Sequence, residues 1–262
     1  MKLISINRKT IMNTNQPVIK MWLYVILNVF LCGSVSGQVR DTTLTVQKAS
    51  SFILPSAMVG YGIISLIGKN PINELDRTTK DELQEDHPKF AAHADNYLQF
   101  APAAAVYALN LSGIKGRHSL ADATGLLFFS ELIMNGTVRS LKAMTNRERP
   151  DHSGFNSFPS GHTANAFATA EFLNQEYKDI SPWYGYAGYT VATVTGLLRM
   201  YNNRHWLSDV VAGAGIGILS TKLSYLLYPY IKRKLFHGKS AEMMISPGYQ
   251  NGKMSLNLIK RF

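Results

Sequence analysis

The chain has 262 residues, of which 46% are hydrophobic and 17% charged, and its formal net charge is +10. This length suits one substantial domain. The composition excludes a disordered chain and suits a well-packed or partly membrane-embedded helical protein. The basic excess fits anionic ligands such as lipid headgroups and phosphates. The sequence has no compact cluster of basic and aromatic residues, so nucleic acid is not an expected partner.

The chain begins with the features of an export signal: basic residues, an apolar run at 21–32 and small residues at 33–37. We expect cleavage after Gly37, so that residues 1–37 are a signal peptide, with an uncleaved signal anchor as the alternative. The sole cysteine, Cys32, follows the bulky Leu31, which disfavours a lipoprotein signal. The mature chain would then have neither disulfides nor thiol chemistry, which is compatible with an oxidising compartment.

Apolar stretches rich in Ala, Leu, Met and Phe follow, without the alternation of strands, so each is predicted to be a helix. The charged interval 69–95 is expected to contain further helix between Pro71 and Pro88. In the tail, a turn-forming run at 247–252 and alternating residues at 253–259 predict a hairpin. We predict an all-α bundle of about six helices in residues 38–240 and a tail, 241–262, with a short hairpin. The apolar stretches are residues 52–68, 97–113, 121–138, 163–173, 183–198 and 210–230.

Two settings fit these helices, a membrane-embedded bundle and a soluble one. The stretch 163–173 offers 11 residues, about half of the roughly 20 that cross a bilayer. Glu131, Asn135 and Lys222 interrupt two of the longer stretches. A polar or ionisable residue within a true span needs a partner or a functional reason, and a soluble bundle accommodates it more easily.

The first block that carries chemistry is the run from Lys142 to Arg149 and Pro150. Two cations seven residues apart, at a helix end followed by proline, can converge on one anion. Arginine contributes a planar fork and lysine a point charge, and both suit phosphate oxygens. Taken alone, a basic helix end favoured by the helix dipole explains the same run.

The second block, Pro-Ser-Gly-His, ends at His162 and directly precedes an apolar helical stretch. Ser160 and Gly161 at a helix start present free backbone N–H groups and a hydroxyl, which together form an anion cradle. His162 at its edge is placed to give a proton to a departing oxygen. An ordinary capped helix with an incidental histidine is the alternative.

The third block contains Arg199, a helix break at 201–203, His205 and Asp209. We expect the helix to restart after the break with an asparagine as its cap, so that His205 and Asp209 share one face of the new helix. The carboxylate would then fix the imidazole tautomer and leave the other ring nitrogen as a nucleophile. A structural His–Asp pair is the alternative for this block in isolation. There are too few carboxylates near the three blocks for a two-metal site, so we predict a site without metal or cofactor.

In this order, the three blocks resemble the signature of the type 2 phosphatidic acid phosphatase family, whose superfamily includes bacterial acid phosphatases and vanadium haloperoxidases. The resemblance extends over roughly residues 50–235. It implies that His205 attacks phosphorus to form a phosphohistidine, that Asp209 orients His205, and that His162 protonates the leaving oxygen. It also implies a phosphate-binding set: Lys142, Arg149, Ser160, Gly161 and Arg199.

The membrane branch of that family hydrolyses lipid phosphates, namely phosphatidate, phosphatidylglycerol phosphate, undecaprenyl diphosphate and lipid A phosphates. With the export signal and the apolar helices, this implies a bacterial envelope lipid phosphatase in the inner membrane, with its site facing the periplasm. Lipid A is our first candidate substrate. The alternatives are a soluble periplasmic non-specific acid phosphatase, a vanadium-dependent haloperoxidase and a non-catalytic anion-binding envelope protein.

The expected topology contains a conflict. The basic loop at 115–119 is expected on the cytoplasmic side. Counting spans back from it places residue 51 inside, whereas a cleaved signal places residue 51 outside. Either the stretch 52–68 does not span, or the leader is retained, or the bundle is not a regular membrane protein.

Overall fold

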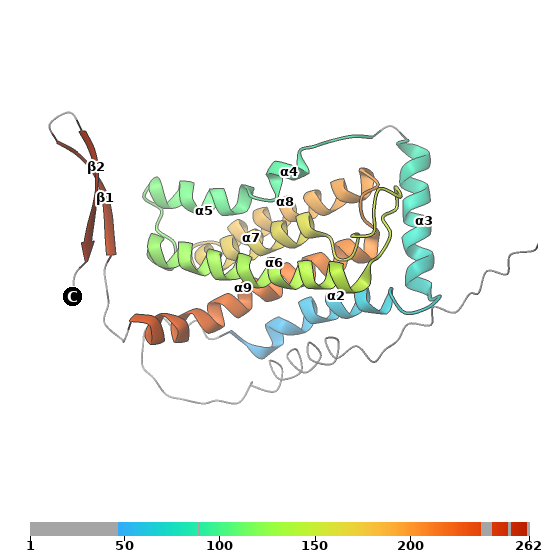
Figure 1. Cartoon of the computed structure of the whole chain (residues 1–262), viewed down its shortest axis with the longest axis horizontal. Helices are drawn as coiled ribbons and strands as arrows, with labels where there is room; N and C mark the ends of the chain where they lie inside the picture. The colour runs from blue at the N-terminus through green and yellow to red at the C-terminus, as the bar shows by residue number, and fades with distance from the viewer. Residues whose placement is uncertain (1–46, 89, 237–242, 251–252, 261–262) are drawn as a thin grey trace, which may run out of the picture. The chain divides into compact units, whose positions relative to one another are not determined.

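The computed structural model describes residues 47–88, 90–236, 243–250 and 253–260 (Figure 1). The predicted signal peptide and the predicted limits of the helical domain, residues 38 and 240, lie outside the described residues. The all-α prediction is confirmed, and the described residues contain eight α-helices where about six were expected. The elements are η1 (Ala49–Phe52), α2 (Ile53–Ile64), α3 (Pro71–Asp86), α4 (Asp95–Leu98), α5 (Ala101–Leu111), α6 (Leu120–Thr145), α7 (Gly161–Tyr177), α8 (Pro182–Tyr201), α9 (Leu207–Phe236), β1 (Met243–Gln250) and β2 (Lys253–Lys260).

The larger helix count has two sources. The charged interval forms α3, whose N-cap Asn70 accepts hydrogen bonds from the backbone of Ile72 and Asn73 in a capping box. The stretch predicted at 97–113 is broken after α4, and α5 restarts with Pro102 in its first turn, where proline is tolerated. Helix α6 ends at Asn146, which has φ 46°, in the left-handed region that asparagine adopts more readily than most residues.

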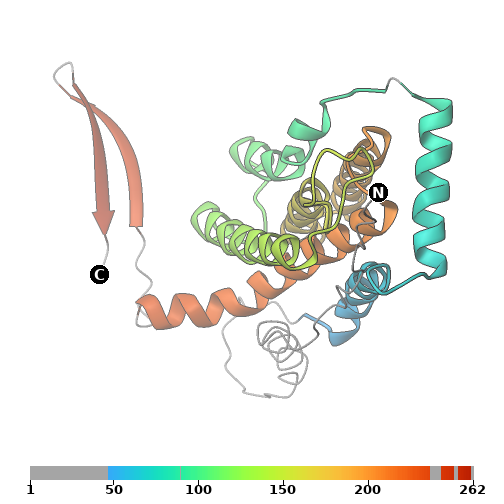
Figure 2. The same ribbon diagram turned by 45° about the vertical axis from the view of Figure 1, so that its right-hand side comes forward.

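Helix α7 packs against α5, α6, α8 and α9, and most of its residues are buried (Figures 1 and 2). Helix α7 can pack this closely against α9 because small residues line the contact between the two helices. A Cβ atom placed on Gly213 of α9 would lie 2.6 Å from the Ser160 carbonyl oxygen, and one on Gly217 would overlap the Ala164 carbonyl. The backbones therefore approach closely, which brings the start of α7 beside the start of α9.

The polar residues that make α7 look short in the sequence are inside the protein. The helix continues past residue 173 to Tyr177 because these side chains find buried partners. The Glu176 carboxylate accepts from the Tyr225 hydroxyl at 2.5 Å, and His118 Nδ1 lies 2.7 Å from it. Lys222 of α9, which needed a partner, forms a 2.9 Å ion pair with the fully buried Glu171 of α7.

Helix α3 runs across the end of the bundle where α8 ends and α9 begins (Figures 1 and 2). In the tail, β1 and β2 pair antiparallel, and the register opposes Gln250 to Lys253. Pro247 and Gly248, expected in the turn, lie within β1 instead. Among the described residues, one helical segment, Leu207–Lys234, is long and apolar enough to cross a membrane by length and composition, and its most apolar window is 67% buried.

Candidate active site

The structure brings the three sequence blocks together at one end of the bundle. Lys142 lies in the last turn of α6 and Arg199 in the last turn of α8. Ser160 is the N-cap of α7, and its backbone N–H donates to the Asp209 carbonyl in the first turn of α9 at 3.0 Å. Two helix ends and two helix starts therefore meet at a single site.

The expectation that His205 and Asp209 share a face of the last helix is wrong, as is the expected asparagine cap. His205 precedes α9, which starts at Leu207. The Asp209 carboxylate accepts from the Trp206 backbone N–H at 3.0 Å, as the acidic residue of a capping box does, and this contact fixes the start of the helix. His205 Nδ1 lies 3.6 Å from Asp209 Oδ2, beyond hydrogen-bonding distance.

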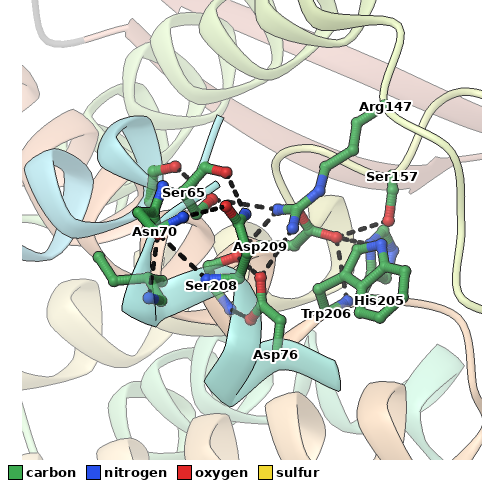
Figure 3. Close-up of polar contacts among 12 residues, drawn as sticks. Ser65, Asn70, Asp76, Arg147, Ser157, His205, Trp206, Ser208 and Asp209 are labelled. Atoms are coloured by element: carbon green, nitrogen blue, oxygen red, sulfur yellow. Dashed lines mark hydrogen bonds and ion pairs between the residues drawn. The ribbon is translucent and has the colours of Figure 1, made fainter. Parts of the chain in front are cut away.

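Asp209 is held by groups other than the histidine (Figure 3). Its carboxylate is fully buried and accepts from Arg147 at 2.7 Å and from the Ser157 hydroxyl at 2.5 Å. Arg147 also pairs with Asp76 of α3 at 2.7 Å, and Asp76 in turn accepts from the Ser208 hydroxyl at 2.6 Å. The carboxylate is therefore fixed and its charge compensated before any substrate binds.

The start of α7 is arranged as an anion cradle. No side chain in the described part of the chain caps this helix, because the Ser160 hydroxyl bonds the Thr163 hydroxyl at 2.8 Å. The N–H groups of its first turn are therefore available to an anion, and the helix dipole adds to their attraction. A Cβ atom on Gly161 would have Lys142 Cε as a neighbour at 4.0 Å, which places the cation against the cradle.

The cations of the site repel one another, and Asn156 holds two of them in place. Lys142 donates to the Asn156 carbonyl, and Arg149 Nε donates to the Asn156 side chain at 2.8 Å. Burial, together with repulsion from Arg149 and Arg199, lowers the pKa of Lys142 to about 8. A dianion bound among three such cations would relieve this repulsion, which is what a phosphate site requires.

The two histidines differ in their surroundings. Burial lowers the pKa of His205 to about 4, against the opposing effect of Asp209, so its imidazole stays neutral near pH 7. His162 lies at the cradle's edge, where burial and then Arg199 lower its pKa. His162 Nε2 lies 2.9 Å from Asn96 Oδ1 of α4, so this nitrogen carries a proton that the amide oxygen accepts.

Helix α4 contacts the site a second time through Asp95, which is buried and accepts from Arg199 at 2.5 Å. Arg199 Nε is also buried, and among the described residues it has no hydrogen-bond partner. A buried donor without an acceptor is costly, so this N–H is the natural place for a ligand oxygen.

Comparison with known proteins shows what part of the chain is similar to. Residues 121–233 match the PAP2 superfamily. These 113 residues are similar to that superfamily and make up less than half of the 262-residue chain. The predicted resemblance is thereby confirmed, since PAP2 is the type 2 phosphatidic acid phosphatase family.

The chain is 43% identical over 150 residues to the lipid A 1-phosphatase of Porphyromonas gingivalis, an alignment that covers 55% of this chain and 33% of that relative. It is 33% identical over 107 residues to phosphatidylglycerophosphatase B of Bacillus subtilis, covering 36% of this chain and 51% of the relative. The chain thus spans about a third and about half of these relatives' lengths. A solved transmembrane PAP2-type phosphatidylglycerolphosphate phosphatase from Bacillus subtilis has a TM-score of 0.46 and 22% identity, over 69% of this chain and 98% of the other.

Several residues of the candidate site were missed by the sequence interpretation. Arg147 lies inside the first block, and its position between Lys142 and Arg149 was a signal that could have been used. Asp76, Asp95 and the two site asparagines, Asn96 and Asn156, carry no such signal, because only the tertiary packing shows which of many polar residues reach the site.

Proposed function

We propose that this protein is a metal-independent phosphoric monoester hydrolase that removes phosphate from a bacterial envelope lipid. The observation that carries the proposal is the convergence, at one end of the bundle, of three cations, an uncapped helix start and a neutral buried histidine beside a fixed carboxylate. Together these groups match the charge, the nucleophile and the orientation that phosphoryl transfer needs. The relatives' names, lipid A 1-phosphatase and phosphatidylglycerophosphatase B, support the same chemistry.

In the first step, the lone pair of His205 Nε2 attacks phosphorus and the bond from phosphorus to the ester oxygen breaks. The alcohol oxygen takes the bonding pair and a proton from protonated His162, and the alcohol leaves. His205 becomes a phosphohistidine whose Nδ1–H carries positive charge toward Asp209. The 3.6 Å gap between them is expected to close as that charge develops, because apo hydrogen bonds tighten in the reacting complex.

In the second step, water attacks phosphorus and gives one proton to His162, which is now neutral. The nitrogen–phosphorus bond breaks, its electron pair returns to His205, and inorganic phosphate leaves. Each group ends the cycle as it began. Throughout, we expect Lys142, Arg149, Arg199 and the first-turn N–H groups of α7 to hold the phosphoryl oxygens.

A membrane setting fits the distribution of side chains on the bundle. Large apolar side chains are exposed on several helices, among them Phe128 at 62%, Trp183 at 74% and Leu54 at 70%. The interior, by contrast, contains the Glu171–Lys222 ion pair. An apolar exterior of this extent suits lipid better than water. We place the protein in the inner membrane with its site facing the periplasm, and a carbonate wash that releases it from membranes would contradict this placement.

Among envelope lipids, lipid A is our first candidate substrate, and phosphatidylglycerol phosphate is the second. Both are suggested by the names of the relatives. The membrane branch of the superfamily also leaves phosphatidate and undecaprenyl diphosphate as alternatives. The choice among them is tested by supplying each lipid in detergent and comparing kcat/KM for release of inorganic phosphate.

The decisive experiment compares the wild-type protein with His205→Ala on a generic phosphomonoester and on lipid A 1-phosphate. We expect phosphate release by the wild type and a loss of at least about 10³-fold in the variant, since no other group can take the nucleophile's place. Rapid quenching of the wild type should trap an acid-labile phosphoprotein that the variant lacks. Near-normal turnover by His205→Ala would overturn the assignment.

A further inference from the structure

A cavity of about 310 Å³ opens beside His162 and Gly161, between the start of α5 and the helices α6 and α7. Its volume lies at the lower end of the range for small-molecule sites. Polar side chains line one part of it: Gln99, Glu131, Asn135 and Asn165. The cavity therefore adjoins the phosphate cradle but contains none of the phosphate-binding cations.

The position of the cavity relative to the reaction follows from His162. Under the proposed function, this histidine protonates the ester oxygen that leaves with the alcohol. The rest of the alcohol must extend from that oxygen into space that His162 borders. Since His162 lines this cavity, the alcohol part of the substrate is the group that would occupy it.

The polar wall of the cavity has more acceptors than donors. The Asn165 side-chain nitrogen donates to Gln99 Oε1 at 3.1 Å, which leaves the Asn165 oxygen facing the Glu131 carboxylate. Turning the amide over lets its nitrogen donate to the two Glu131 oxygens, at 2.9 and 3.0 Å, but then its oxygen faces Gln99 Oε1 at 3.1 Å. While Glu131 is ionised, two oxygens face each other in either orientation. A donor relieves this contact, either a proton on Glu131, whose pKa burial raises to about 7, or a hydroxyl group from outside.

The wall is also held in place before a ligand arrives. Gln99 donates to the Asn96 carbonyl at 3.0 Å, and its own carbonyl accepts from the Thr169 hydroxyl at 2.9 Å. Asn135 donates to Glu131 at 3.1 Å, one helical turn away on α6. A polar wall fixed by its neighbours loses little entropy on binding, which is a condition for selective recognition.

We propose that this cavity binds the alcohol part of the phosphate ester, and that its acceptor-rich wall selects an alcohol bearing further hydroxyl groups, such as a sugar ring or glycerol. The inference rests on the proposed phosphatase function and deepens it. Hydroxyl groups supply a donor to the facing oxygens of Glu131 and Asn165. A second phosphate group on the same part of the substrate is disfavoured, because its acceptor oxygens would meet the acceptor oxygens of Glu131.

The other residues that line the cavity are apolar, so the bound alcohol would need one polar face and one apolar face. Phe100, Met134 and Val138 complete the cavity. A sugar ring presents hydroxyl edges and C–H faces, so it can satisfy both walls at once. A simple alkyl alcohol would leave the acceptors unpaired, and sites built to bond a hydroxyl discriminate strongly against analogues that lack it.

The test compares three phosphate esters in detergent: glucose 1-phosphate, glycerol 1-phosphate and n-hexyl phosphate. We expect the wild-type kcat/KM to be higher for a hydroxylated ester than for the hexyl ester, and the preferred one shows whether a sugar or glycerol is the better fit. Glu131→Gln should reduce this preference about 10-fold or more, because an amide nitrogen replaces one of the two acceptor oxygens. Asn135→Leu should reduce it in the same direction by less.

Glu85→Gln, which changes an exposed carboxylate of α3, is the matched control and should keep the wild-type preference. A wild type that prefers the hexyl ester, or a Glu131→Gln variant with an unaltered preference, would overturn the inference. A wild type that releases phosphate from none of the esters would overturn the proposed function instead. Thermal unfolding of each variant shows whether a change in preference accompanies a folded protein.

Discussion

Two partly buried arginines at the candidate site have opposite surroundings. The terminal nitrogens of Arg147 donate to two carboxylates, Asp76 and Asp209, each at 2.7 Å, and to the Ser208 hydroxyl at 2.8 Å. Arg199 has one carboxylate partner, Asp95 at 2.5 Å, and within the described residues its Nε has no acceptor.

The difference indicates two separate tasks. Arg147 lies between two negative charges, so its role is to join α3 to the start of α9 and to fix Asp209. Arg199 is balanced by a single carboxylate and retains a free donor, so it can bind an incoming anion. Each arginine has one carboxylate partner, Asp76 or Asp95, from a helix before residue 121, outside the region that matches the PAP2 superfamily.

The largest expected effect is on stability at Arg147. Arg147→Lys removes the planar fork that reaches both carboxylates and leaves one of them buried without compensation, which we expect to lower the free energy of unfolding by about 3 kcal/mol. Thermal or denaturant unfolding in detergent measures this. Arg139→Lys, at an exposed position of α6, is the control and should be near neutral. Equal unfolding midpoints for both variants would contradict a bridging role for Arg147.

At Arg199 the same substitution should act on catalysis. A lysine can still pair with Asp95 but has no Nε donor, so Arg199→Lys should lower kcat/KM about 10- to 100-fold, with a smaller change in stability than Arg147→Lys. Steady-state kinetics on a generic phosphomonoester provide the measurement. If Arg199→Lys retained wild-type kcat/KM, the free donor would have no part in binding phosphate.

The different partners of the two arginines show what the sequence can and cannot predict. The helices and the three blocks follow from local patterns, since apolar runs and motif spacing are local properties. The partners of Arg147 and Arg199 do not, because Asp76 lies 71 residues and Asp95 lies 104 residues away in the chain. The start of α9 was misplaced for a related reason: a side-chain bond from Asp209 to the Trp206 backbone decided it.

A smaller effect is expected from Asp76, which acts on the reaction through its contacts with Arg147 and Ser208. Asp76→Asn leaves the charge of Arg147 uncompensated on that side and draws Asp209 away from His205. We expect kcat to fall about 10-fold, which corresponds to about 1.4 kcal/mol, with little change in KM. Asp76→Glu should restore part of the rate, since it returns the charge. A raised KM with unchanged kcat would show instead that Asp76 affects substrate binding.

The smallest expected effect is a shift in the pH dependence of activity, which we expect when Asp95 is replaced but not when Asp76 is replaced. His162 must carry its proton to act as the acid, so activity falls as pH rises through its pKa, which burial lowers. The acid limb should lie near pH 4, where His205 becomes protonated and can no longer attack. Lys142, with a pKa of about 8, keeps its charge across the active range.

The charge of Asp95 favours protonated His162 and so raises its pKa, against the effect of burial. Asp95→Asn should therefore lower the pKa of His162 and move the basic limb of the kcat/KM profile to lower pH. Asp76→Asn should leave that limb in place, because Asp76 neighbours Arg147 rather than the acid. The profiles must be corrected for ionisation of the substrate phosphate, which titrates near pH 6. If both variants shifted the basic limb equally, Asp95 and Asp76 would affect the pKa of His162 in the same way. That result would contradict the separate roles of Arg199 and Arg147.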